Sequence, residues 1–185
     1  MGLGGLQALS EGSGSASSHI LLVMADPRCA DDEALRAVHE AAHATVALLI
    51  GFDFDAVTLP EPTDDRIGLS FSQYDLAPGE EMDAVFAAHV EARITVRLAG
   101  EAIEGRLCGA VRFAGADILA AQHDSLRATS DEPAAAAELR KLCKERAYYL
   151  VARAHGEIGA VADALLEATS LDWSQVAEIV FQNED

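Results

Sequence analysis

The spacing of hydrophobic residues changes along the chain, and the changes mark its expected elements. Between Asp31 and Gly51 the apolar positions recur with a helical period. Asp31 or Asp32 can cap the start of this helix, and Gly51 is typical of a helix end. Residues 54–60 and 66–73 have strand character and are separated by "EPTDD", which supplies turn-forming residues. This arrangement predicts a β-hairpin directly after the helix.

Most of the remaining chain has helical periodicity. Helices are expected over 80–107, from near Asp117, over 133–155 and over 157–169. Close to the C-terminus, Asp172 and Gln175 have the spacing of a capping box, which indicates that one more helix begins there. The pattern therefore predicts a mainly α (α+β) fold, with a small hairpin or sheet beside the helix that starts near Asp31.

The composition is that of a packed domain. The chain has 185 residues, half of them hydrophobic, which suits one domain with a single core. Residues 1–18 include "EGSGSASS" and are expected to form a flexible Gly/Ser-rich tail. Residues 19–185 are expected to form the domain.

The charge balance excludes some partners. The chain has 13 basic and 31 acidic residues, which gives a formal net charge of −18 at pH 7. Such a surface repels phosphate groups, so neither nucleic acid nor an anionic membrane surface is expected as a partner. The early apolar run at residues 20–25 is too short to cross a bilayer.

The number and spacing of the cysteines indicate the redox environment of the protein. Cys29, Cys108 and Cys143 lie far apart in the sequence and form no CxxC pair. An odd and sparse set argues against a disulfide framework and favours a reducing environment. We therefore expect a cytoplasmic protein.

The segment "HEAAH" at residues 39–43 carries the candidate chemistry. His39 and His43 are four residues apart, so a helix places both imidazoles on one face, where they can bind one zinc ion. Glu40 can then act as general base toward a zinc-bound water rather than as a ligand. The alternative is a helix that carries these residues by chance. Burying two imidazoles and a carboxylate without partners would be costly, which favours the metal site.

The third ligand is not determined by spacing. The extended motif HExxHxxGxxH is excluded, because Val46 and Leu49 stand where it needs Gly and His. The ligand must come from another element. The candidates are the other histidines, His19, His89, His123 and His155, and numerous Asp and Glu residues.

Several segments resemble the FtsH family of ATP-dependent zinc metalloproteases, in the same order along residues 33–181. "LRAVHEAAHATVALL" resembles the active-site helix, and "FDAVTLPEPTDDRIGLSF" resembles the strand pair that follows it. "ITVRLAGEAIEGRLCG" resembles the helix with the Gly-Arg-Ala-Ala-Glu pattern, although Glu101 replaces the Arg. "AGADILAA" is similar to the segment in which a Gly-Ala pair precedes an Asp-Leu pair.

The resemblance implies a third zinc ligand. In the family this ligand is the Asp of the Gly-Ala…Asp-Leu segment, which corresponds to Asp117. Asp124 is the rival, because the Arg, Ala and Thr that follow it match the family's offsets. Glu104 is a candidate for orienting a ligand. Tyr74 and His123 are candidates for a second group that stabilises the oxyanion.

The resemblance implies a zinc-dependent endopeptidase in which His39, His43 and Asp117 hold Zn²⁺. The family's ATPase has no counterpart, since the only lysines, Lys141 and Lys144, follow no P-loop glycines. The expected substrates are therefore peptides or unfolded segments, unless a separate ATPase supplies them. A homo-oligomer is also possible, because the family's protease domains form rings. The alternative is a catalytically silent domain that binds zinc or a partner.

Overall fold

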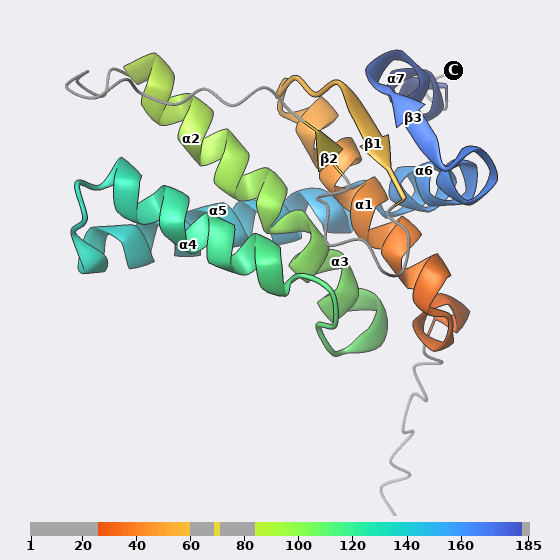
Figure 1. Ribbon diagram of the computed structural model, residues 1–185, viewed down its shortest axis with the longest axis horizontal. Coiled ribbons are helices and arrows are strands. Elements are labelled where there is room, and N and C mark those ends of the chain that lie inside the picture. Colours follow the sequence, from red (N-terminus) through yellow and green to blue (C-terminus); the bar gives the residue numbers. More distant parts are fainter. Residues whose placement is uncertain (1–25, 60–68, 71–83, 183–185) are drawn as a thin grey trace, which may run out of the picture.

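The computed structural model describes residues 26–59, 69–70 and 84–182 of the chain. This part is mainly helical with one small sheet, as the sequence predicted (Figure 1). Its elements are η1 (Pro27–Ala30), α1 (Asp32–Leu49), β1 (Ala56–Thr58), β2 (Leu69–Ser70), α2 (Ala84–Arg97), α3 (Ala99–Cys108), α4 (Gly115–Ala128), α5 (Pro133–Arg153), α6 (His155–Ala168), β3 (Ser170–Asp172) and α7 (Trp173–Phe181).

Helix α1 is the central element. The Asp31 side chain accepts hydrogen bonds from the backbone N–H groups of Glu33 and Ala34, which caps the start of the helix as predicted. Gly51, with a φ of +69°, follows its end. Residues 37–48 are all buried, because α3 and α6 cover α1 together with α2 and α7. The many alanines of α1 let these neighbours approach closely.

The sheet lies beside α1. Strand β1 is in the middle and pairs antiparallel with β2 on one side and with β3 on the other. The pairing of β1 with β2 confirms the predicted antiparallel strands, although residues 60–68 and 71–83 lie outside the described residues. The sequence did not reveal β3. The capping box between Asp172 and Gln175 is present at the start of α7.

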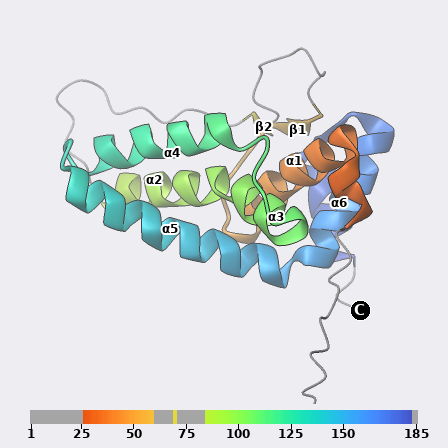
Figure 2. The same cartoon turned by 90° about the horizontal axis from the view of Figure 1, so that it is seen from below.

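The prediction of one helix over 80–107 is wrong, because α2 and α3 are separate. Leu98 lies between them with a ψ of −2°, far from the helical value of about −42°. Helix α3 packs against α1. Helices α2, α4 and α5 pack together at the other end of the molecule, with α2 between α4 and α5 in the view of Figure 2.

The sequence argued against a disulfide framework, yet the structure contains a disulfide. Cys29 and Cys108 form a disulfide, and Cys143 is a buried free thiol. The fold brings two residues together that are 79 positions apart, with their Cα atoms 5.6 Å from each other. Disulfides persist mainly in oxidising compartments, so the cytoplasmic expectation loses the support it took from the cysteines.

Among the described residues, no helix combines the length and the apolar character that a membrane span requires. The predicted tail at residues 1–18 lies outside the described part of the chain.

Candidate metal centre

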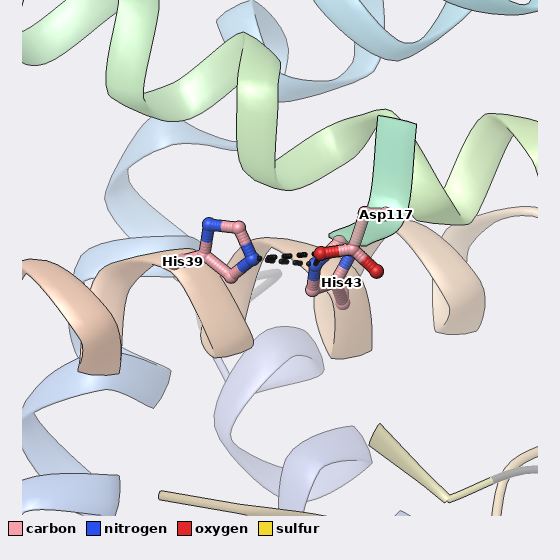
Figure 3. Close-up of side chains that lie close together, drawn as sticks. All are labelled: His39, His43 and Asp117. Atoms are coloured by element: carbon pink, nitrogen blue, oxygen red, sulfur yellow. Dashed lines mark hydrogen bonds and ion pairs between the residues drawn. The ribbon is translucent and has the colours of Figure 1, made fainter. Parts of the chain in front are cut away.

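Three predicted ligands lie together at the junction of α1 and α4. His39 and His43 project from the middle of α1, and Asp117 lies in the first turn of α4 (Figure 3). The two Nε2 atoms are 2.9 Å apart. Asp117 Oδ2 is 3.2 Å from His39 Nε2 and 3.5 Å from His43 Nε2. Both histidines are buried, and the Asp117 side chain is only 16% exposed.

The opposite nitrogen of each ring has its own partner. His43 Nδ1 donates a hydrogen bond to the backbone oxygen of Val96 over 2.7 Å, since a carbonyl can only accept. His39 Nδ1 is 2.6 Å from Glu104 Oε1 and donates to that carboxylate. In the neutral state each ring therefore presents an unprotonated Nε2, and the two lone pairs face each other and the Asp117 carboxylate.

Three lone pairs that converge at this distance require a cation between them. Zn²⁺ binds imidazole nitrogen at about 2.0–2.1 Å, which places neighbouring ligand atoms of a tetrahedral site roughly 3.3 Å apart. The three separations of 2.9, 3.2 and 3.5 Å scatter around this value. Two imidazoles and a carboxylate are also a donor set that zinc favours in catalytic sites. The residues therefore fit a zinc ion.

In the metal-free protein a proton takes the place of the cation. Burial lowers the pKa of His39, but hydrogen bonds to Asp117 and Glu104 and the nearby charge of Glu40 outweigh it and raise this pKa to about 10. Burial raises the pKa of Asp117, yet the charge of His43 and the hydrogen bond from His39 hold it well below its usual range. The two shifts are complementary, because the protonated imidazole and the carboxylate each favour the charged form of the other.

Glu104 on α3 fixes the orientation of His39. Its side chain is fully buried. Besides the bond from His39, it accepts hydrogen bonds from the backbone N–H groups of Arg112 and Phe113, the latter over 3.1 Å. Burial alone would raise its pKa, but the bond from His39 and the two backbone donors lower it. Glu104 is therefore an anion that holds the imidazole, in the arrangement common around zinc-bound histidines.

Glu40 lies next to the cluster without belonging to it. Its side chain is buried, and among the described residues its Oε2 has no hydrogen-bond partner. Burial raises the pKa of Glu40, while the charges of His43 and His39 oppose the shift. A buried acceptor without a partner is costly. This oxygen is therefore available to a small molecule bound at the cluster, such as water.

Gly100 is a site residue that the sequence reasoning missed. A Cβ atom at this position would lie 2.3 Å from His39 Cε1, inside van der Waals contact. Helix α3 can pass the imidazole only because residue 100 has no side chain. The available signal was a glycine within a helical pattern, which often marks a close approach.

The rival ligand Asp124 lies elsewhere. It accepts hydrogen bonds from Arg93 Nη2 and Arg97 Nε, each over 3.0 Å, and all three side chains are buried. Of the two candidates for the oxyanion, His123 is largely exposed and adjoins Asp124 rather than the cluster. Tyr74 lies outside the described residues.

No protein-family model matches this chain, and no curated protein matches it in sequence. The resemblance to the FtsH family therefore stays a prediction from the motifs. A metal site is supported by the geometry of the described residues alone. Within those residues, the group His39, His43 and Asp117 is the one set of three that is arranged to hold a metal ion.

Proposed function

We propose that this protein is a zinc-dependent metallopeptidase that hydrolyses peptide bonds in peptides or unfolded segments. The observation that carries the proposal is the convergence of the lone pairs of His39 and His43 on the Asp117 carboxylate, with the unpartnered oxygen of Glu40 close by. A ligand set alone would suit a structural zinc. A buried carboxylate that is free to accept a proton is what a hydrolytic site needs in addition.

His39, His43 and Asp117 would hold the ion. When bound, zinc supplies a Lewis acid that polarises the scissile carbonyl and makes a nearby water more acidic. Glu104 keeps the His39 ring in the orientation that directs Nε2 toward the site, and the Val96 carbonyl does the same for His43. Neither ring has to reorganise for binding, which is the advantage of a preorganised site.

Glu40 would act as the general base. It accepts a proton from the attacking water and returns it to the amine that leaves. Because burial raises its pKa above the ordinary value of 4.5, the proton is held more firmly than by an exposed carboxylate. A base with a pKa closer to the working pH shuttles protons more effectively.

The substrate class follows from the resemblance. In the FtsH family an ATPase unfolds substrates before they reach the protease, so the protease itself acts on chains without stable structure. We therefore propose chains without stable structure as substrates, supplied either directly or by a separate ATPase. A homo-oligomer, as in the family's rings, belongs to the same proposal.

The test compares Glu40→Gln with Glu33→Gln, an exposed glutamate in the first turn of the same helix. Each purified protein is loaded with zinc, analysed for metal and incubated with a fluorescently labelled, disordered polypeptide. We expect about one zinc per chain in all three proteins. Cleavage by the Glu40 variant should fall by about 10²–10⁴-fold, while the Glu33 variant matches the wild type.

Two outcomes would overturn the proposal in different ways. If the wild type binds zinc but cleaves none of a broad set of unfolded chains, the protein is a silent zinc-binding domain. If it cleaves and Glu40→Gln cleaves equally well, the assigned base is wrong.

A further inference from the structure

A disulfide ties together the two segments that flank the metal centre. Cys29 lies in η1, directly before α1, and Cys108 is the last residue of α3. Helix α1 carries His39, Glu40 and His43. The six residues that follow Cys108, residues 109–114, lead to α4 and Asp117, and we refer to them as the connector. The bond therefore joins the start of the histidine helix to the start of the connector.

The connector serves the metal centre in two ways. It begins at Gly109, whose φ of +65° ends α3, and it delivers Asp117 in the first turn of α4. In its middle, the backbone N–H groups of Arg112 and Phe113 donate to Glu104, the carboxylate that holds His39. A displacement of the connector would thus disturb a metal ligand and the support of a second ligand at the same time.

Arg112 provides a second, noncovalent link across the same gap. Its guanidinium donates to the backbone oxygen of Cys29 over 3.2 Å and to the carboxylate of Asp32. The side chains of Arg112 and Asp32 are both exposed, with 41% and 59% of their surfaces accessible. Exposed ion pairs contribute little, typically about 0–1 kcal/mol. The covalent link is therefore the stronger of the two.

We infer that the Cys29–Cys108 disulfide is a redox-sensitive clamp on the metal centre, so that the protein holds its metal tightly when oxidised and loosely when reduced. The inference rests on the proposed zinc site. Both cysteines are only half-buried, so a thiol reagent can reach them. A dithiol reductant donates two electrons. One of its thiolates attacks a sulfur of the bond, its second thiol resolves the mixed disulfide, and Cys29 and Cys108 are released as two thiols.

After reduction, the connector keeps only noncovalent contacts to η1 and α1. The two links should therefore substitute for each other in part. Loss of the Arg112 link matters little while the disulfide is intact, and it matters more once the disulfide is gone. This dependence distinguishes a clamp from a disulfide that only raises the overall stability by restricting the unfolded chain. In that second case the effect of Arg112→Gln on zinc affinity would not depend on the disulfide.

The test measures the zinc dissociation constant by competition with a chromophoric chelator, in the absence of added thiol. The proteins are the wild type, Arg112→Gln, the double variant Cys29→Ser/Cys108→Ser, and the triple variant. Cys143→Ser and Arg106→Gln serve as controls, since Cys143 is the free thiol and Arg106 is an exposed residue of α3. Far-ultraviolet circular dichroism checks that each protein is folded.

Mutations in the shell around a metal typically cost about 10–100-fold in affinity. We expect zinc binding about 10-fold weaker in the double variant and about 100-fold weaker in the triple variant. Arg112→Gln alone and both controls should remain within about twofold of the wild type. If the double variant does not fold, wild-type protein reduced with a phosphine and desalted without air takes its place.

A double variant, or reduced wild type, that binds zinc as tightly as the oxidised protein would overturn the clamp and leave the proposed peptidase intact. Equal effects of Arg112→Gln with and without the disulfide would also overturn it. A wild type that binds no zinc would instead refute the proposed function on which the clamp depends.

Discussion

Two buried polar clusters each include one aspartate of α4. They differ in whether the charge of this aspartate is compensated by neighbouring side chains. Asp117 and Asp124 are seven residues apart, about two helical turns, so they share a face. Asp124 sits between the guanidinium groups of Arg93 and Arg97. Asp117 faces His39 and His43, whose other ring nitrogens are already engaged.

The difference separates a carboxylate with a structural role from one that is a candidate metal ligand. Asp124 meets only donors, so its charge is compensated without any further partner. Asp117 meets acceptors, and the group is incomplete until a proton or a metal ion joins it. The residue type is the same in both places. What its neighbours donate or accept determines the role.

The largest effects are expected when each carboxylate is removed in turn. Asp117→Ala should lose tight zinc binding, measured by metal analysis after desalting, because one of three ligands is gone. Asp124→Ala leaves two buried guanidinium groups without their carboxylate. It should lower the free energy of unfolding by about 3–5 kcal/mol in urea denaturation, while the molecules that remain folded keep their zinc.

The reverse result, with zinc lost only in Asp124→Ala, would move the site to the other cluster. Both carboxylates are expected to be needed for the native activity, so activity alone would not separate them. Metal content per folded molecule and unfolding free energy must be measured together.

A smaller effect is expected where α3 passes the candidate metal centre. Gly100→Ala would place a methyl group 2.3 Å from the ring of His39. The ring or the helix must move, and zinc affinity should fall by about 10-fold or more, as for other changes around metal ligands. Gly156→Ala in α6 is the matched control, because no atom lies within 4 Å of the added group. Isothermal titration with zinc gives both affinities.

Equal affinities in the two alanine variants would mean that α3 yields easily and that the glycine is not needed. A loss in Gly156→Ala would point to a general effect of glycine replacement on the helices rather than a contact with the imidazole.

The smallest expected effect is the release of protons when zinc binds. The metal-free protein holds a proton on His39, whose pKa is raised to about 10, whereas an ordinary imidazole with a pKa near 6.5 is neutral at pH 8. Zinc binding at pH 8 should therefore release about one proton. Titrations in two buffers with different ionisation enthalpies measure this number. Identical heats in both buffers would contradict the raised pKa.

The same shift fixes the sign of a stability change. Because the folded pKa of His39 lies above its unfolded value, the stabilisation is complete below about pH 6.5 and is lost as the pH rises toward 10. The melting temperature of the metal-free protein should fall over that interval.

Local patterns made part of this structure predictable. The capping carboxylate of Asp31, the helical period and Gly51 were sufficient to predict α1, and the spacing of His39 and His43 then placed both on one face. The break at Leu98 was not visible, because the helical period continues through it. Strand β3 is too short to leave a pattern and is defined by its pairing with β1.

The remaining errors concern contacts between distant segments. Nothing near Cys29 or Cys108 indicates that the two meet across 79 positions. The choice between Asp117 and Asp124 had the same difficulty. Arg93 and Arg97 decide it, and they lie on a different helix from either carboxylate.

The burial of α1 has a consequence for hydrogen exchange. Residues 37–48 are enclosed on every side by other elements, so their backbone amides gain access to solvent only when the surrounding helices separate. His39, Glu40 and His43 thus belong to the segment that should exchange its amide protons most slowly. Deuterium would enter this helix only through global unfolding, and the two histidines would keep their relative positions for as long as the molecule remains folded.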